Sequence, residues 1–214
     1  MPVPAIKICG VTTPDALDAA IAGRAQYVGF NFFPPSPRHL TLPNAAALAA
    51  RAEERIVRVG VFVDADDATL AEAVAAARLD AIQLHGKETA GRAGQVRARF
   101  GLPVWKVVAV SSAEDVQRAG TYAEAAEVIL FDARTPKDAA LPGGMGLSFD
   151  WSLLRAWKAP VAWGLAGGLT PGNVAEAARL TGTPLVDTSS GVESAPGLKD
   201  VDKIAAFCRA VHAG

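Results

Sequence analysis

An alternation between two kinds of segment, repeated eight times along the chain, constrains the fold more than any other feature. Short apolar runs alternate with alanine-rich stretches that have helical spacing. Several of the runs are rich in Val, Ile and Phe and are apolar on both faces, as buried parallel strands are. We predict strands at Ala5–Cys9, Tyr27–Asn31, Arg58–Val63, Ala81–Leu84, Val104–Val108, Val128–Asp132, Val161–Leu165 and Leu185–Asp187.

The segments between the predicted strands carry helix start and stop signals. Thr13 can cap the first helix, Pro14 suits the first helical position, and Gly23 ends it. Thr170 and Pro171 repeat this opening before the seventh helix. Apolar residues of the last helix recur at spacings of three and four, which predicts a stripe that packs against a neighbour.

Strand followed by helix, eight times over, is the pattern of the (β/α)8 TIM barrel. Such barrels usually take about 250 residues, so the 214 residues of this chain predict short loops and one barrel domain over residues 1–214. A doubly wound open sheet has the same alternation and is the structural alternative. Eight units, rather than five or six, favour the α/β barrel.

Composition argues against several classes of protein. The chain has 21 Lys and Arg against 22 Asp and Glu, so no broad basic face exists to bind nucleic acid. These charges are scattered, which argues against a membrane-binding patch, and no apolar run is long enough to span a membrane. The first residues lack a secretory signal, and two distant cysteines, Cys9 and Cys208, form no disulfide framework. We therefore expect a cytoplasmic protein.

In such a barrel the active site lies at the carboxyl ends of the strands, and three predicted strands end on reactive side chains. These residues are Cys9, Asp132 and Asp187. Lys7 faces the same side of its strand as Cys9, so its ammonium favours a thiolate. The structural alternatives are that Cys9 is a small core residue, that Asp132 caps the next loop, and that Asp187 only orients the turn after it. Cys208 lies on the stripe of the last helix, and we expect it only to pack.

Two segments are suited to a phosphate group. Gly167 and Gly168 follow the seventh predicted strand and lead into a helix, and Ser189, Ser190 and Gly191 follow the eighth. Glycine lets backbone N–H groups approach an anion, and a helix N-terminus adds its positive end. Barrels of this kind often hold phosphate at these two loops. The two segments together predict a phosphate site.

Three further features belong to the candidate site. Arg38 offers a planar fork suited to a carboxylate, although an exposed arginine is commonly only solvated. His85, at the end of the fourth predicted strand, lines the site or makes a structural hydrogen bond. The glycine-containing loop Ala133–Phe149 is long enough for a lid. The chain has three histidines, none spaced with another ligand, so we predict no metal site.

An ordered set of motifs, running from about Lys7 to the last helix, resembles the phosphoribosylanthranilate isomerase family. The resemblance covers essentially the whole chain. The matching segments are Lys7–Thr12, Gly29–Phe32 with Ser36–Arg38, Val59–Val63, Gln83–Gly86, Gly143–Gly144 through Phe149–Trp151, Ala166–Leu169 and Asp187–Glu193.

The resemblance implies an activity and a role for each residue. The family converts N-(5-phosphoribosyl)anthranilate to 1-(2-carboxyphenylamino)-1-deoxyribulose 5-phosphate by an Amadori rearrangement, the third step from anthranilate in tryptophan biosynthesis. Cys9 would be the general base and Asp132 the general acid, Arg38 would hold the anthranilate carboxylate, and the two glycine-containing loops the phosphate. Lys7, His85 and Asp187 are our further candidates for substrate contact. We expect no cofactor, a small-molecule substrate, no nucleic acid or membrane partner, and a monomer or homodimer.

Two residues depart from the family pattern, and other functions stay open. Met145 stands where Thr is expected, and Ala166 where Ser is usual. The enzyme alternatives are another metal-free phosphosugar isomerase or epimerase, and a Schiff-base aldolase that would use Lys106. A barrel that binds phosphosugars without catalysis is the non-enzymatic alternative.

Overall fold

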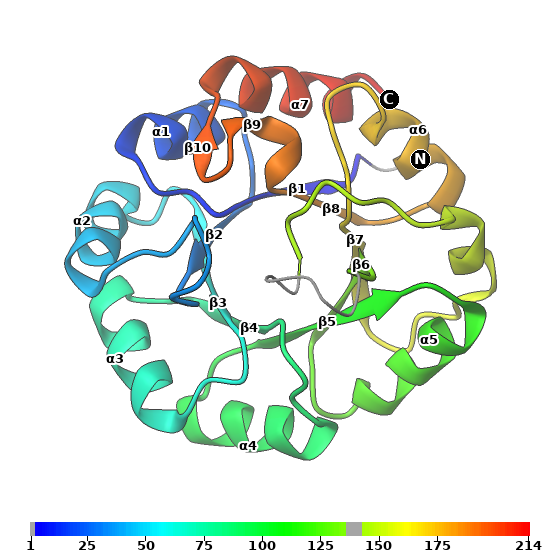
Figure 1. Cartoon of the computed structure of the whole chain (residues 1–214), viewed down its shortest axis with the longest axis horizontal. Helices are drawn as coiled ribbons and strands as arrows, with labels where there is room; N and C mark the ends of the chain where they lie inside the picture. The colour runs from blue at the N-terminus through cyan, green and yellow to red at the C-terminus, as the bar shows by residue number, and fades with distance from the viewer. Residues whose placement is uncertain (1–2, 136–142) are drawn as a thin grey trace.

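Eight parallel strands form one closed barrel in the computed structural model, which describes residues 3–135 and 143–214. Each strand pairs with the next in chain order, and the last pairs with the first. Figure 1 shows the barrel end-on, with helices around the outside. The strands are β1 (Ala5–Cys9), β2 (Tyr27–Asn31), β3 (Val57–Phe62), β4 (Ala81–Leu84), β5 (Val104–Val110), β6 (Val128–Ala133), β7 (Ala162–Leu165) and β8 (Leu185–Thr188).

The barrel prediction is confirmed, and the open-sheet alternative is wrong, because β1 and β8 are paired. Strands β1, β2 and β4 have the predicted bounds, and the other strands differ by one or two residues at an end. Where β5 runs longer than predicted, the reason is its neighbour: Ala109 and Val110 pair with Asp132 and Ala133 of β6.

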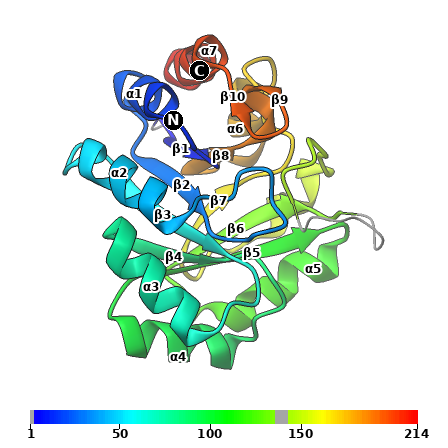
Figure 2. The same ribbon diagram turned by 60° about the vertical axis from the view of Figure 1, so that its left-hand side comes forward.

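The helices cover the outside of the barrel (Figures 1 and 2). Thr13 caps the first helix by accepting a hydrogen bond from the N–H of Ala16, and Gly23 stands at its C-cap, as predicted. No helix within the described ranges is long and apolar enough to cross a membrane. The α-helices are α1 (Pro14–Ala22), α2 (Leu42–Ala52), α3 (Asp67–Ala77), α4 (Ala90–Phe100), α5 (Ala113–Arg118), α6 (Val174–Thr181) and α7 (Val201–Ala213).

Three short 3₁₀ helices and one hairpin complete the described part of the chain. The 3₁₀ helices are η1 (Ala119–Tyr122), η2 (Trp151–Ala156) and η3 (Ser190–Val192), and the hairpin pairs β9 (Glu193–Ala195) with β10 (Leu198–Lys199). This hairpin lies in the connection from β8 to α7 (Figure 1).

The prediction of eight α-helices is wrong for the connection between β6 and β7. Its described residues contain the 3₁₀ helix η2 instead of an α-helix. A 3₁₀ helix is a frequent form of connector between longer elements. Pro160 follows closely and disfavours helical backbone at the residue before it.

The seventh predicted helix also begins later than expected. Thr170 and Pro171 form a turn, and α6 begins at Val174. Asn173 accounts for the turn, because its side-chain oxygen accepts from the N–H of Thr170 and its amide donates to the carbonyl of Gly168. These two bonds hold the chain in a turn before α6, and the carbonyl of Thr170 accepts from the N–H groups of Asn173 and Val174.

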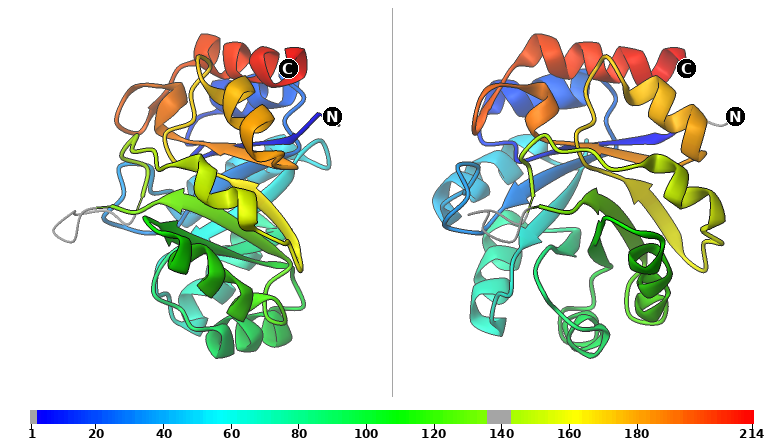
Figure 3. Two further views of the ribbon diagram at one scale, coloured as in Figure 1. Left: turned by 90° about the vertical axis from the view of Figure 1, so that its right-hand side faces the viewer. Right: turned by 45° about the vertical axis from the view of Figure 1, so that its right-hand side comes forward.

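The core has two parts, because side chains alternate between the faces of each strand. A cluster made only of strand residues fills the inside of the barrel: Val59, Ala81, Trp105, Val107, Leu130 and Leu185. A larger cluster lies between the barrel and its helices; Figure 3 shows the strands and the surrounding helices from two further sides. Cys208 belongs to this outer layer, where its sulfur faces Gly23 closely, so the prediction that it only packs is confirmed.

Replacing Phe207 with Ala tests the packing between α7 and the barrel. Phe207 is fully buried, so the cavity left behind should lower the free energy of unfolding by about 3–5 kcal/mol. Arg209 is exposed on the same helix, and Arg209→Ala should change the free energy by less than about 0.5 kcal/mol. Urea denaturation measures both, and equal effects of the two variants would contradict this packing.

Candidate active site

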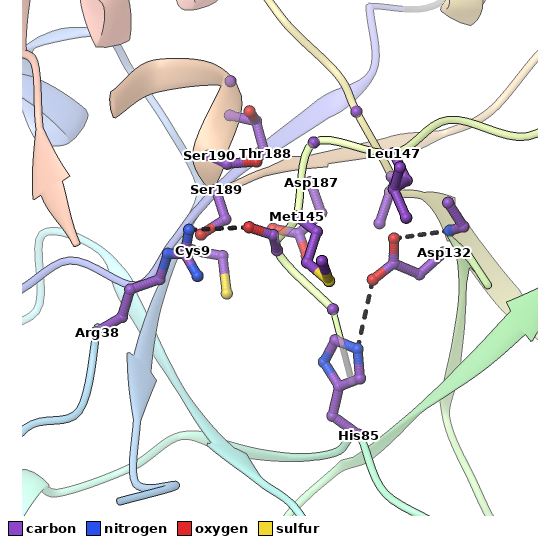
Figure 4. Close-up of a pocket in the computed structure, with 18 of the residues that line it drawn as sticks. Cys9, Arg38, His85, Asp132, Met145, Leu147, Asp187, Thr188, Ser189 and Ser190 are labelled. Atoms are coloured by element: carbon purple, nitrogen blue, oxygen red, sulfur yellow. Dashed lines mark hydrogen bonds and ion pairs between the residues drawn. The ribbon is translucent and has the colours of Figure 1, made fainter. Parts of the chain in front are cut away.

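A pocket opens at the carboxyl ends of the strands, where the sequence predicted the site. Residues of seven strands, or of the loops that follow them, line it. Figure 4 shows Arg38 and Cys9 on one side of the pocket and His85 and Asp132 on another. The predicted site residues that line the pocket are Cys9, Arg38, His85, Asp132, Gly167, Gly168, Asp187, Ser189, Ser190 and Gly191.

Cys9 stands at the end of β1, opposite Gly29 of β2 in the register of the sheet. A Cβ atom on Gly29 would lie 2.7 Å from the Cys9 sulfur, which is too close for any side chain. Gly29 thus makes the space that the thiol occupies. A glycine inside a strand often marks a close approach of this kind, which is the signal that could have identified Gly29 from sequence.

Lys7 does not line the pocket; it lies deeper in the barrel and is fully buried. Its Nζ lies 3.0 Å from each carboxylate oxygen of Asp187, its register partner on β8. Burial alone would lower the pKa of Lys7, but the Asp187 carboxylate raises it above its ordinary value. Asp187 therefore serves first to neutralise Lys7.

The Lys7 ammonium favours the Cys9 thiolate, as expected, but burial of the thiol outweighs it in the ligand-free site. Burial raises the pKa of the Cys9 thiol, the Lys7 ammonium lowers it, and the Asp187 carboxylate raises it. The net effect is a pKa above the ordinary value. Cys9 is therefore a thiol at neutral pH until another positive charge comes close to it.

Asp132 presents its two carboxyl oxygens to different neighbours. Oδ1 accepts a hydrogen bond of 2.8 Å from the N–H of Ala133. Oδ2 lies 3.3 Å from Nε2 of His85, a nitrogen that is buried and has no hydrogen-bond partner within the described part of the chain. A Cβ on Gly143 would lie within 3.0 Å of both side chains, so glycine is needed where this loop crosses them.

Arg38 is buried, and most of its donors are already used. Its Nε and Nη2 donate to the two oxygens of Glu193 at 2.7 and 2.8 Å, and Nη2 also donates to the carbonyl of Gly144. Gly10, with a φ of +73°, leaves room for the Arg38 stem, because a Cβ there would lie 2.6 Å from its Cδ. Nη1 has no acceptor within residues 3–135 and 143–214 and is available to a ligand.

Sequence reasoning missed the two charged residues that surround Arg38. Glu193 was only part of a matching motif, and Lys199 was not considered. Lys199 is buried and donates to Glu193 Oε1 at 2.6 Å. No local pattern marks either residue, since their partners lie far away in the sequence or on the β9–β10 hairpin.

The two predicted phosphate segments lie side by side and both line the pocket. The carbonyl of Leu169 accepts from the hydroxyl of Thr188, which joins the segments. Among the described residues, the backbone N–H groups of Gly167, Gly168, Ser190 and Gly191 have no acceptor. Because α6 begins only at Val174, its N-terminus does not directly follow the glycine pair.

The described end of the loop Ala133–Phe149 closes one side of the pocket. Met145 and Leu147 line the pocket, and a Cβ on Gly144 would lie 2.6 Å from Nη1 of Arg38. Residues 136–142, part of the predicted lid, lie outside the described residues. Met145 and Ala166, which depart from the family pattern, both line the pocket.

Within the described ranges, no group of three or more His, Cys, Asp or Glu residues is placed to hold a metal ion. The absence of a metal and a cofactor stays a prediction.

Comparison with known proteins agrees with this geometry. A family model described as N-(5'phosphoribosyl)anthranilate (PRA) isomerase matches residues 6–210. An N-(5'-phosphoribosyl)anthranilate isomerase of Paramagnetospirillum magneticum is 54% identical over 214 residues, covering 100% of this chain and 99% of the relative.

Two solved structures are similar to the barrel throughout. The first shows monomers generated from the dimeric phosphoribosylanthranilate isomerase of Thermotoga maritima; it has a TM-score of 0.85 and 33% identity, covering 99% of this chain and 100% of that one. The second is a phosphoribosylanthranilate isomerase in complex with reduced 1-(o-carboxyphenylamino)-1-deoxyribulose 5-phosphate, with a TM-score of 0.86, 32% identity and the same coverage.

The closed barrel and the reactive side chains at its rim define a (β/α)8-barrel enzyme. The chain belongs to the N-(5'-phosphoribosyl)anthranilate isomerase family and is an isomerase of tryptophan biosynthesis.

Alkylation by iodoacetamide tests the charge state of Cys9. Because burial raises the pKa of the Cys9 thiol above its ordinary value, little of it is thiolate at neutral pH, and the rate should rise about tenfold per pH unit through the neutral and mildly alkaline range. Mass spectrometry of the Cys9 peptide measures the rate at each pH. A rate that levels off below pH 8 would contradict a raised pKa.

Two further measurements show whether slow alkylation of Cys9 comes from its raised pKa or from poor access of iodoacetamide to the thiol. Asp187→Asn removes a negative charge near Cys9, so alkylation at pH 7 should become faster. Cys208 is the internal control, since burial raises its pKa to about 11 and its rate should not change with residue 187. An Asp187→Asn rate equal to that of the unchanged protein would rule out the carboxylate as a cause.

Proposed function

We propose that this pocket carries out the reaction of the family, the Amadori rearrangement of N-(5-phosphoribosyl)anthranilate to 1-(2-carboxyphenylamino)-1-deoxyribulose 5-phosphate. In this proposal Cys9 is the general base and Asp132 the general acid. The observation that carries it is that the thiol, from β1, and the carboxyl, from β6, line one pocket together with two groups suited to anions. The substrate has a negative group at each end, a phosphate and a carboxylate.

The phosphate binds at the loops after β7 and β8, held by Gly167, Gly168, Ser189, Ser190 and Gly191. Backbone N–H groups in these loops that have no acceptor among the described residues support this role. Oriented amides bind an anion without adding charge of their own. Phosphate binding anchors one end of the substrate, and this positioning serves the chemistry at the other end of the ribose.

The anthranilate carboxylate binds Nη1 of Arg38. The other edge of the guanidinium is occupied by Glu193, which supports a single orientation for the edge that faces the pocket. Charge-assisted hydrogen bonds from arginine to carboxylates are short and directional. With the phosphate held elsewhere, the carbon atoms that react lie between the two anchors.

Asp132 donates the proton that opens the ribose ring. Protonation of the ring oxygen breaks the bond between that oxygen and carbon 1, and the anthranilate nitrogen supplies electrons to form a cationic Schiff base. Oδ1 is bound to the N–H of Ala133, so Oδ2 is the oxygen that carries the proton. His85, 3.3 Å from Oδ2, is placed to contact the same part of the substrate.

The cationic Schiff base lowers the pKa of the Cys9 thiol, which gives up its own proton to water, and the thiolate then removes the proton on carbon 2. The Schiff base draws the electrons of that C–H bond into a new double bond between carbons 1 and 2, which gives an enolamine. The positive charge of the Schiff base and the Lys7 ammonium offset the burial that raises the pKa of the thiol. Tautomerisation of the enolamine to the ketone completes the reaction, with no oxidant, reductant or cofactor required.

The alternative reactions have weaker support. A Schiff-base aldolase would need a free lysine in the site, but Lys106 is outside the pocket and donates to Glu88 and to the carbonyls of Leu84 and Gly86. A non-catalytic barrel would have no need of Cys9 and Asp132 together. No observation favours another phosphosugar isomerase.

The remaining parts of the proposal concern the whole protein. Residues 1–214 act as one catalytic domain in the cytoplasm, as a monomer or homodimer, with a small-molecule substrate and no nucleic acid or membrane partner.

Loss of the anthranilate-type fluorescence of enzymatically generated phosphoribosylanthranilate, in the presence of EDTA, tests the reaction. The unchanged protein should consume the substrate rapidly, and Cys9→Ala and Asp132→Asn should each lower kcat by about 10²–10⁴-fold, because each removes one proton-transfer group. Binding of the reduced product analogue should survive in both variants.

Cys208→Ala is the matched control, since that thiol packs in the outer layer of the core. It should leave kcat unchanged. Normal turnover in Cys9→Ala or Asp132→Asn would refute the assignment of that residue, and loss of activity on adding EDTA would refute metal-free catalysis.

A further inference from the structure

A buried cluster of three charged residues lies beside the pocket, and the proposed chemistry does not use two of them. Arg38, Glu193 and Lys199 are all buried. Glu193 stands at the start of β9, just after η3, and Lys199 at the end of β10, so the hairpin brings both against the loop that carries Arg38 (Figure 1). Burying three charges together costs folding free energy unless each charge has partners. We therefore looked for a contribution of this cluster to substrate binding.

Glu193 fixes which edge of Arg38 faces the pocket. Its two oxygens accept from Nε and Nη2, a fork-to-fork contact that allows one orientation of the guanidinium plane. The N–H of Gly197, on the turn of the hairpin, lies 3.3 Å from Glu193 Oε2 and helps hold the carboxylate in turn. The edge with Nη1 is left toward the pocket, where Arg38 is one of the lining residues.

The same carboxylate is joined to the phosphate loop. Lys199 Nζ donates to Glu193 Oε1 at 2.6 Å, to the carbonyl of Ser189 at 3.0 Å and to its hydroxyl at 3.2 Å. Glu193 Oε1 therefore accepts from Arg38 and Lys199 at once. A continuous path of short polar contacts runs from Arg38 to Ser189.

Glu193 also offsets the positive charges of Arg38 and Lys199. Arg38 and Lys199 contact the same carboxylate; burial, with a smaller effect from the Arg38 guanidinium, lowers the pKa of Lys199 below its ordinary value, while Glu193 raises it. Burial raises the pKa of Glu193, but its contacts with Arg38 and Lys199 bring the pKa below its ordinary value, so the group is ionised at neutral pH. One anion between two cations leaves a net positive charge, which suits a substrate that is negative at both ends.

We propose that Glu193 is a positioning residue for the substrate: it presents Arg38 to the carboxylate and, through Lys199, holds Arg38 at a fixed separation from the Ser189 loop. This inference rests on the proposed function, in which Arg38 binds the carboxylate and the Ser189 loop the phosphate. Glu193 itself touches no reacting atom.

The test compares two ligands that differ only in the carboxylate: the reduced product analogue and the same compound with phenyl in place of carboxyphenyl. The unchanged protein should bind the first about 10–100-fold more tightly, the contribution of a charge-assisted contact. In Glu193→Gln the preference should fall below about threefold, because the amide is neutral and presents an NH2 donor to one of the two Arg38 donors, so the paired contact with the guanidinium is lost. Isothermal titration calorimetry measures both affinities.

Asp18→Asn is the matched control, since it breaks an exposed carboxylate–arginine pair with Arg51 on the outside of the barrel. It should keep the full preference. Should Glu193→Gln fail to fold, Glu193→Asp replaces it, because the shorter carboxylate keeps the charge and loses the fork geometry. A fully kept preference in the folded Glu193 variant would overturn the proposal.

Arg38→Met separates failure of this inference from failure of the proposed function. If the unchanged protein and Arg38→Met discriminate equally between the two ligands, Arg38 does not bind the carboxylate and the proposed function is wrong on that point. If Arg38→Met loses the preference and the Glu193 variant keeps it, only the positioning role fails.

Lys199→Met tests the link to the phosphate loop. Competitive inhibition by inorganic phosphate should become several-fold weaker, because Ser189 loses the ammonium that holds it. Unchanged inhibition by phosphate would overturn the coupling between the two ends of the site.

Discussion

Closure of the barrel between β1 and β8 is the constraint on which the site depends. In that pairing Lys7 lies opposite Asp187, and neither charge could be buried inside the barrel without the other: removing one partner of a buried pair costs about 3–5 kcal/mol. The register of β1 also sets Cys9 against Gly29 on the other side. The two ladders of backbone hydrogen bonds on either side of β1 thus fix the buried ion pair and the position of the thiol.

The proposed reaction needs a thiolate and an undissociated carboxyl group, the reverse of the ordinary order of their pKa values, about 8.5 for Cys and 3.9 for Asp. The ligand-free site does not supply the thiolate, since burial and Asp187 raise the pKa of the Cys9 thiol. Because Asp187 already neutralises Lys7, the added positive charge has to come from the substrate. In this mechanism the base is therefore activated when the cationic Schiff base forms beside it, and the resting enzyme keeps an unreactive thiol.

The features predictable from sequence are those that depend on neighbours along the chain. Alternation located the strands, and residues at strand ends, such as Cys9 and Asp132, reach the rim in any barrel of this topology. The missed features depend on distant partners. Glu193 meets Arg38 across 155 positions of sequence, and Gly29 is needed only because Cys9 lies opposite. The late start of α6 has a local cause, the side chain of Asn173, but it competes with an equally local helix signal at Thr170 and Pro171.

A substrate with an anion at each end places a demand on the distance between its two anchors. Two independent anion sites on flexible loops would bind both ends while leaving the reacting carbons free to move, and misplacement by about 1 Å can cost about 10²-fold in rate. Joining the anchors through buried, short contacts removes that freedom before the substrate arrives. In the proposed mechanism the cost of burying Arg38, Glu193 and Lys199 is therefore offset during catalysis: the hairpin holds Arg38 and the Ser189 loop together, and Cys9 and Asp132 stand on strands whose register cannot shift.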